Sequence, residues 1–224
     1  MKAMILAAGF GSRLRPLTET IPKPLLEVGG KPLLQYHLER LAAAGITDII
    51  INTSWLAELI EDYFGDGSDF GVKIQWSREA QPLETGGGVA RALPLLGSEP
   101  FLLINGDVWT DFPLHSVSLD KGMDAHLVMV TNPQHHPEGD FAVANNLVSY
   151  DVGSKYTFSG ISLFRPQLFA GYEEDCFPLR DVMRPAILSG NVSGEVYTGD
   201  WWDIGTVDRL SRLNKQLNTA ESKQ

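Results

Sequence analysis

The sequence has one cysteine, Cys176, in 224 residues, which excludes an internal disulfide and any cysteine-rich metal site. It has no run of about 18 apolar residues that could span a bilayer, and its start lacks the charged-then-apolar pattern of a signal peptide. Basic residues are also scarce, because 18 Lys and Arg stand against 28 Asp and Glu, giving a formal net charge of −10. Such an acidic chain is a poor partner for nucleic acid or an anionic membrane, and no protein partner is evident. We expect a cytoplasmic protein.

Apolar residues make up 43% of the chain, which is enough for the core of one α/β domain. Short apolar runs alternate with stretches of helical periodicity, and this alternation is typical of βαβ units around a mainly parallel sheet. Residues 141–151 are predicted to form a hairpin that turns at Asn145 and Asn146. The expected strands cover 3–6, 48–52, 72–76, 101–105 and 124–131, and the expected helices cover 32–44, 56–64, 89–96, 178–188 and 207–217.

The first strand leads directly into a loop of small residues, Ala7-Ala8-Gly9-Phe10-Gly11-Ser12. Glycines leave no Cβ in the way, so the backbone amides of such a loop can surround an anion. Positive charge is concentrated here, and arginine can bind phosphate oxygens two at a time. The loop therefore predicts a polyphosphate ligand. Four basic residues lie within nineteen positions: Arg13, Arg15, Lys23 and Lys31.

Two common phosphate-binding motifs are excluded at this loop. A P-loop requires a glycine-lysine pair five residues after its first glycine, and neither Gly9 nor Gly11 has one. The dinucleotide motif Gly-x-Gly-x-x-Gly starts correctly, but Leu14 stands in place of its third glycine. The phosphate loop is therefore of another kind.

Two later stretches also predict parts of a site. Three glycines at 86–88 precede the expected helix at 89–96, which is costly in conformational entropy unless the backbone must approach something closely. The apolar strand 101–105 ends in Asn105 and is followed by Gly106 and Asp107, so Asp107 lies at the strand's carboxyl end, where ligands bind in open α/β sheets. A turn carboxylate without function is the alternative for Asp107. A carboxylate at this position suits Mg²⁺, which binds carboxylates together with phosphate oxygens.

The segments LAAGFGSRLRPLT and PKPLLEVGGKPLL together resemble the signature of the sugar-1-phosphate nucleotidylyltransferases. The resemblance implies a Rossmann-like, GT-A-like α/β fold with a mixed, mainly parallel central sheet and a small sugar-binding β subregion. It implies a single domain over 1–224, with a nucleotide-binding part near 1–110 and a sugar-binding part near 111–205. A C-terminal helix is expected over 206–219.

The resemblance also implies roles for particular residues. Arg13 and Lys23 are the expected catalytic residues, and the stretch Trp201-Trp202-Asp203-Ile204-Gly205-Thr206 adds Asp203 to Asp107 as the Mg²⁺ pair. Lys155 is a candidate to neutralise an acidic substituent of the sugar. The expected nucleotide-binding residues are Ala8, Gly9, Gly11, Ser12, Arg13, Lys23, Gln81 and Gly86. The expected sugar-binding residues are Asn105, Gly139, Asp140, Thr157 and Gly160.

The implied reaction joins a nucleoside triphosphate to a sugar 1-phosphate with release of pyrophosphate. Within the family, the compact chain looks most like the uridylyltransferases of peptidoglycan recycling, so we expect UTP and a cell-wall sugar 1-phosphate. Guanylyl transfer to mannose 1-phosphate and cytidylyl transfer to choline phosphate are the alternatives. A non-catalytic nucleotide-sugar-binding subunit is an alternative of another class, although Arg13, Lys23, Asp107 and Asp203 are all present.

Overall fold

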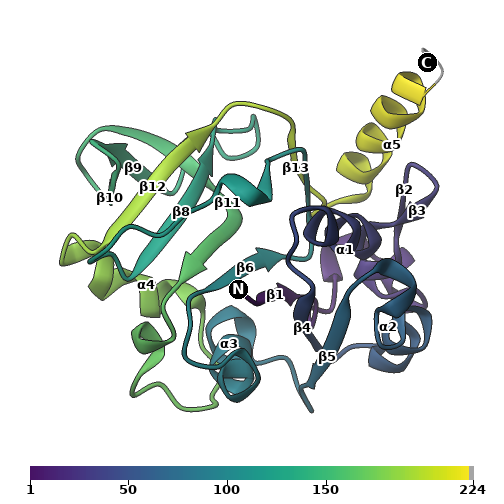
Figure 1. Cartoon of the computed structure of the whole chain (residues 1–224). Coiled ribbons are helices and arrows are strands. Elements are labelled where there is room, and N and C mark those ends of the chain that lie inside the picture. Colours follow the sequence, from purple (N-terminus) through teal and green to yellow (C-terminus); the bar gives the residue numbers. More distant parts are fainter. Residues whose placement is uncertain (222–224) are drawn as a thin grey trace.

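The computed structural model describes residues 1–221, in which helices and a large sheet form one α/β body (Figure 1). The strands are β1 (Ala3–Leu6), β2 (Glu27–Val28), β3 (Lys31–Pro32), β4 (Asp48–Thr53), β5 (Lys73–Arg78), β6 (Phe101–Asn105), β7 (Val108–Thr110), β8 (Ala125–Val130), β9 (Phe141–Ala144), β10 (Leu147–Ser149), β11 (Ser154–Phe164), β12 (Val192–Tyr197) and β13 (Trp201–Asp203). The α-helices are α1 (Leu33–Ala43), α2 (Ala57–Phe64), α3 (Glu84–Leu96), α4 (Leu179–Leu188) and α5 (Val207–Glu221). Short 3-10 helices lie at Ser12–Leu14, Leu17–Glu19, Lys23–Leu25, Ser68–Phe70, Leu114–Ser116 and Pro166–Phe169.

The main sheet has nine strands in the order β5-β4-β1-β6-β11-β8-β12-β10-β9. Parallel pairing joins β5, β4, β1 and β6, and it joins β8 to β12. The other neighbours are antiparallel, so the mixed α/β sheet expected from the sequence is confirmed. The parallel strands are concentrated in the N-terminal part, where their carboxyl ends share one edge. Because the sheet continues from β6 into β11, it runs through both expected parts of the chain, and the division into 1–110 and 111–205 stays a prediction.

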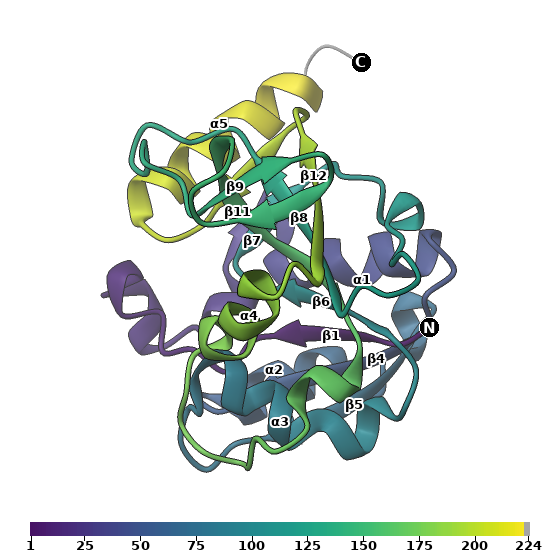
Figure 2. The ribbon, with the colours of Figure 1, turned by 90° about the vertical axis from the view of Figure 1, so that its left-hand side faces the viewer.

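The helices cover the two faces of the sheet, and Figure 2 shows them on either side of β1 and β4. Alternating side chains of β1 explain the layering, since Ala3 and Ile5 pack with α1 and α2 whereas Met4 packs with α3 and α4. A third, smaller core holds α5 against β2 and the first loop. None of the helices within residues 1–221 is both long and apolar enough to cross a membrane.

Several elements follow directly from local sequence. Helix α1 begins after Pro32 and buries one apolar stripe, and Gly45, which follows its C-cap residue Ala44, adopts a φ of 75° that suits glycine. Strands β9 and β10 pair through a turn in which Asn145 and Asn146 have φ of 51° and 60°, so the hairpin prediction is confirmed. Helix α5 extends to Glu221, beyond the predicted limit of 219, and residues 222–224 lie outside the described part of the chain.

The start of α3 differs from the prediction. The helix begins at Glu84, five residues earlier than expected, so the three glycines lie inside it and are buried. A Cβ at Gly87 would lie 1.9 Å from the carbonyl oxygen of Asp175, and one at Gly86 would lie 2.4 Å from the Phe177 ring. The expectation of a close approach therefore holds, but its partner is the chain's own segment 175–177. Glycine's low helix propensity concealed this first turn from sequence reasoning.

Strands β7 and β13 form a separate two-stranded ribbon beside the main sheet. Their register places Asp203 opposite Val108, and the Ile204 amide donates a 2.7 Å hydrogen bond to the Asp107 carbonyl. The ribbon therefore brings the C-terminal Trp-Trp-Asp stretch to the carboxyl end of β6. Helix α5 follows immediately and packs against the first loop through Leu210 and Leu213.

Candidate active site

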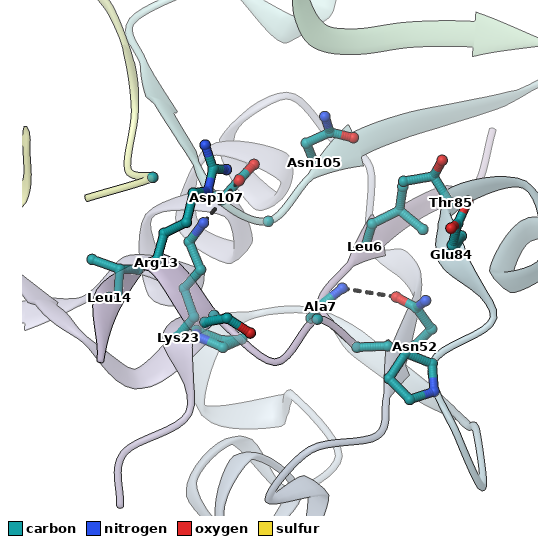
Figure 3. A pocket seen from close by; sticks show the side chains of 18 of the residues that line it. Leu6, Ala7, Arg13, Leu14, Lys23, Asn52, Glu84, Thr85, Asn105 and Asp107 are labelled. Carbon is teal, nitrogen blue, oxygen red and sulfur yellow. Dashed lines mark hydrogen bonds and ion pairs between the residues drawn. The ribbon is translucent and has the colours of Figure 1, made fainter. Parts of the chain in front are cut away.

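A cavity of about 420 Å³ opens where β1, β4 and β6 end, and Figure 3 shows its side chains. The parallel strands end at this edge of the sheet, where open α/β sheets bind their ligands. Most of the expected nucleotide-binding residues lie in its wall. The predicted residues that line it are Ala8, Gly9, Gly11, Ser12, Arg13, Lys23, Asn105 and Asp107.

The small-residue loop forms one side of the cavity and is braced from behind. The Gly11 φ of +64° is favourable for glycine, and its carbonyl accepts a 2.9 Å hydrogen bond from the Thr18 hydroxyl. A Cβ at Gly11 would lie 2.8 Å from the Thr18 methyl carbon, whereas a Cβ at Gly9 would meet no atom within 4 Å. Gly9 therefore presents its backbone to open space from a rigid support, as an anion-binding loop requires.

Lys23 and Asp107 form an ion pair in the cavity wall, with Nζ and Oδ2 2.8 Å apart. The two side chains are 14% and 34% exposed, so Lys23 is the better buried partner. Burial raises the pKa of Asp107, but the charge and hydrogen bond of Lys23, aided by Arg13, outweigh it and hold that pKa below its usual value. Asp107 is therefore an ionised carboxylate at neutral pH. Lys23 is the first residue of a short 3-10 helix, with Pro22 directly before it and Pro24 directly after it.

Asp203 lies just outside this cavity, in the wall of a second one of about 200 Å³. Its carboxylate pairs with the Arg209 guanidinium and lies 3.2 Å from the His135 imidazole. Gly205 separates the two cavities: it lines the first, and a Cβ there would lie 3.3 Å from the Arg13 guanidinium carbon and 2.3 Å from an Arg209 nitrogen. Asp203 is therefore a close neighbour of the first cavity without lining it.

A buried polar chain supports the opposite wall, and sequence reasoning missed it. The Asn52 carbonyl oxygen accepts a 2.7 Å hydrogen bond from the Ala7 amide, and its amide group donates one of 2.7 Å to Glu79. The other Glu79 oxygen accepts a 2.9 Å bond from the Leu83 amide. Glu79 is only 5% exposed, and burial raises its pKa despite these bonds. Asn52 lies next to the last residue of the apolar strand β4, Asn105 ends β6, and this position near a strand end was the available signal.

The predicted residues Gln81 and Gly86 do not line the cavity. Gln81 is exposed, and the Gly86 amide already donates a 2.9 Å hydrogen bond to the Phe177 carbonyl. Glu84 and Thr85 line the cavity in their place. Glu84 has a φ of 59°, which is uncommon outside glycine and directs the chain into α3.

The predicted sugar-binding residues fall into two groups. Asn105 lines the cavity, and Gly160, with φ of 82°, lies so close that a Cβ would be 2.8 Å from the Asn105 side chain. Gly139, Asp140 and Thr157 instead attach loop 132–140 to β11. The Thr157 hydroxyl donates a 3.0 Å bond to Asn132, and Asp140 accepts a 2.8 Å bond from the Phe158 amide. The structure therefore brings the first pair to the cavity and leaves the other three outside it.

The two carboxylates, Asp107 and Asp203, fit Mg²⁺ only together with oxygen atoms of a bound ligand. Asp107 lies in the turn between β6 and β7, and Asp203 ends β13 opposite Val108. Mg²⁺ usually takes one or two carboxylates together with phosphate oxygens. Nowhere in residues 1–221 do three His, Cys, Asp or Glu side chains gather closely enough to hold a metal alone. The two carboxylates are paired with Lys23 and Arg209, and a metal carried by a polyphosphate would replace these cations.

Sequence comparison then identifies the family. A model of the family described as "Nucleotidyl transferase" matches residues 2–220. The chain belongs to the nucleotidyl transferase family. The N-acetylmuramate alpha-1-phosphate uridylyltransferase of Neisseria meningitidis is 51% identical to this nucleotidyl transferase over 94% of its chain and 95% of the relative. The mannose-1-phosphate guanyltransferase of Hypocrea jecorina is 30% identical over 92% of the chain, which spans only 61% of that relative's length.

Solved structures share the fold of this nucleotidyl transferase. A putative glucose-1-phosphate thymidylyltransferase from Bacillus anthracis, solved with a sucrose, matches with a TM-score of 0.84 at 23% identity and covers 97% of this chain and 95% of its own. HddC from Yersinia pseudotuberculosis, solved with GMP-PN, matches with a TM-score of 0.79 at 25% identity and covers 96% of this chain and 98% of its own. The fold expected from the family signature is thus confirmed.

Proposed function

We propose that this nucleotidyl transferase transfers a uridylyl group from UTP to N-acetylmuramate α-1-phosphate and so produces UDP-N-acetylmuramate and pyrophosphate. The observation that carries the proposal is the 51% identity, over nearly the full length of both chains, to a uridylyltransferase of this kind. A cavity with an open glycine loop and two cations supports it. The corresponding setting is peptidoglycan recycling in the cytoplasm, with small molecules rather than proteins, membranes or nucleic acid as partners.

Phosphate binding in this proposal falls to the small-residue loop. The backbone near Ala8, Gly9, Gly11 and Ser12 holds the β- and γ-phosphates, and Arg13 adds a charged fork. Arg13 lines the cavity close enough to Asp107 to lower the pKa of that carboxyl. Pyrophosphate leaves from this place, so positive charge here stabilises the leaving group.

Lys23 serves the reacting centre. The sugar phosphate oxygen attacks the α-phosphorus in line with the leaving pyrophosphate, and no covalent nucleophile is needed, so positioning and charge stabilisation supply the rate. Lys23 is nearly buried and its ammonium lies at Asp107, so it can neutralise the α-phosphate and the incoming phosphate together. Asp107 and Asp203 would hold Mg²⁺, which lowers the charge repulsion between the two phosphate groups when it is bound.

The sugar extends from Lys23 toward Asn105 and Gly160. Asn105 offers an amide at the cavity wall, and the missing side chain at Gly160 leaves room beside it. Gly139, Asp140 and Thr157 support this side indirectly, through loop 132–140. We further propose that residues 1–110 serve mainly the nucleotide and residues 111–205 mainly the sugar within one domain.

The test is Mg²⁺-dependent pyrophosphate release with UTP, GTP, CTP, ATP and dTTP, each combined with N-acetylmuramate, N-acetylglucosamine, glucose and mannose 1-phosphates and with phosphocholine. We expect turnover with UTP and the muramyl phosphate, abolished by EDTA. Turnover only with GTP and mannose 1-phosphate, or with CTP and phosphocholine, would mean that the same site acts on substrates other than those proposed. Absence of turnover with every pair, in a protein that still binds UTP, would favour a non-catalytic binding subunit.

A further inference from the structure

The second cavity of about 200 Å³ lies beyond Asp203, outside the residues assigned so far to nucleotide or sugar. Loop 132–140 provides one side of it, strand β13 the floor, and the first turns of α5 the other side. Its volume is several times the roughly 30 Å³ that one water molecule occupies in the liquid, so it can hold a small chemical group. The residues that matter below are His135, Trp201, Trp202, Asp203, Arg209 and Arg212.

The charges in this cavity leave one cation without a counterion. Arg209 is bound to the Asp203 carboxylate, and its guanidinium also lies 2.7 Å from His135 Nε2, which is itself 3.2 Å from the Asp203 carboxylate. Arg212, one helical turn further, forms no ion pair with any carboxylate in residues 1–221. Its guanidinium lies 5.9 Å from the Trp202 ring centre, which positions the charge at the cavity edge. The cavity is therefore apolar along its tryptophans and carries one unused positive charge.

The cavity lies where a substituent of the proposed sugar would emerge. The Trp201 indole N–H donates a 2.8 Å hydrogen bond to the Ser159 carbonyl, directly before Gly160, and Gly160 lies against Asn105 in the first cavity. On the phosphate side, Gly205 separates Arg13 of the first cavity from Arg209 of the second. A sugar whose phosphate lies at Lys23 and whose ring lies at Asn105 thus has the second cavity beside it.

We infer that the second cavity is the subsite for an acidic substituent of the sugar, in which Arg212 binds the carboxylate and the tryptophan faces accommodate the short carbon branch that carries it. The inference rests on the proposed function, since N-acetylmuramate differs from N-acetylglucosamine by a lactyl ether with one methyl group and one carboxylate. An arginine fork suits a carboxylate, and Trp201 and Trp202 suit the methyl group. Arg212 is then a specificity residue and takes no part in phosphoryl chemistry.

Lys155 is not in position for this role. It is exposed on β11, where it pairs with Ala142, and it lines neither of the two cavities. Arg212 of the C-terminal helix therefore takes the role that the sequence suggested for Lys155. Lys155 serves as the matched control cation in the experiment.

The experiment measures, by titration calorimetry, the dissociation constants of UDP-N-acetylmuramate and UDP-N-acetylglucosamine for the wild type and for Arg212→Gln, Arg212→Lys and Lys155→Ala. Wild-type pyrophosphate release with UTP and N-acetylmuramate 1-phosphate accompanies it. We expect Arg212→Gln to reduce the preference for the muramyl nucleotide at least about tenfold, because a charge-assisted hydrogen bond is lost. Arg212→Lys should reduce it less, and Lys155→Ala should leave it unchanged.

The outcomes separate this inference from the proposed function. An equal preference in wild type and Arg212→Gln, or an equal loss of affinity for both nucleotide sugars, overturns the subsite while muramyl turnover by the wild type still supports the function. A larger effect of Lys155→Ala than of Arg212→Gln also overturns it. A wild type that transfers uridylyl to other sugar phosphates but not to N-acetylmuramate 1-phosphate overturns both. Circular dichroism of each variant shows that it is folded, which the exposed position of Arg212 favours.

Discussion

Two glycine-rich segments of this chain look alike in sequence and serve opposite purposes. The segment at 9–11 presents Gly9 to open space in the main cavity, whereas the segment at 86–88 is buried against Asp175 and Phe177 of the same chain. In the first, the missing side chain leaves room for a ligand, and in the second it lets two parts of the protein meet. A glycine run thus predicts a close approach, but the fold decides whether the approaching atoms belong to a ligand or to the protein.

The largest expected effect comes from removing the positive charge of Lys23, which lines the same cavity as the glycine segment at 9–11. Lys23→Met should lower kcat/KM about 10³-fold, or about 4 kcal/mol of transition-state stabilisation, because a buried cation at the reacting phosphates is lost. Steady-state pyrophosphate release measures this. Since Lys23 holds the Asp107 pKa down, that pKa should also rise in the variant, and NMR titration of the carboxyl would show it. An unchanged Asp107 titration would contradict the ion pair as described.

A substitution in the glycine segment at 86–88 should lower the free energy of unfolding. Gly87→Ala places a Cβ 1.9 Å from the Asp175 carbonyl oxygen, so either α3 or segment 175–177 must move. We expect the free energy of unfolding to fall by about 3 kcal/mol, as for severe overpacking. Urea denaturation measures it, with Gly9→Ala as the control in which no atom lies within 4 Å of the new methyl group. Equal stability of the two variants would remove the distinction between the segments.

A buried histidine near Asp107 predicts a pH dependence. His37 on α1 is buried, and burial, followed by the charge of Arg40, lowers its pKa from 6.5 to about 4. The unfolded chain takes up this proton below pH 6.5 and the folded chain only near pH 4, so stability falls as the pH decreases through that window. This residue should account for a loss of about 2 kcal/mol between pH 7.5 and 5.

His37→Leu is the matching variant, because Nε2 of His37 has no hydrogen-bond partner in the part of the chain that the structure describes. Denaturant unfolding at several pH values should show a shallower loss in the variant than in the wild type. Parallel curves for the two proteins would place the acid sensitivity elsewhere.

The smallest effect tests the open glycine itself. Gly9→Ala should change the free energy of unfolding by less than about 1 kcal/mol, because its φ lies outside the left-handed region and its Cβ meets no neighbour. UTP affinity should nevertheless fall about tenfold, as the methyl group occupies the space where a phosphate would approach the backbone. Calorimetric titration with UTP measures this. An unchanged affinity would show that the triphosphate lies away from Gly9.

Sequence reasoning found the parts of the site that depend on strand ends and on one continuous loop. Asp107 was placed by the carboxyl end of a buried strand, and the small-residue loop by its glycines and basic neighbours, and both line the cavity. Both signals lie in short stretches of sequence, and the parallel sheet brings these stretches together because its strands end at one edge.

The remaining parts depend on contacts between distant segments. The Asn52 to Glu79 hydrogen bond joins β4 to the residue that follows β5, and Ile204, next to Asp203, donates a hydrogen bond to the Asp107 carbonyl. The family resemblance implies a nucleotide-binding role for Gly86, and its backbone amide donates a hydrogen bond to the Phe177 carbonyl of a distant loop. No single stretch of sequence reveals such partners.

The ribbon of β7 and β13 joins residues that leave the ribosome far apart in time. The small-residue loop at 7–12 emerges first and Asp107 later, whereas Asp203 and the first turns of α5 emerge only after the further stretch that holds β8 to β12. A nascent chain therefore carries the small-residue loop and Asp107 well before it has Asp203 or Arg212. The wall between the two cavities can therefore form only after Asp203 and Gly205 have been synthesised.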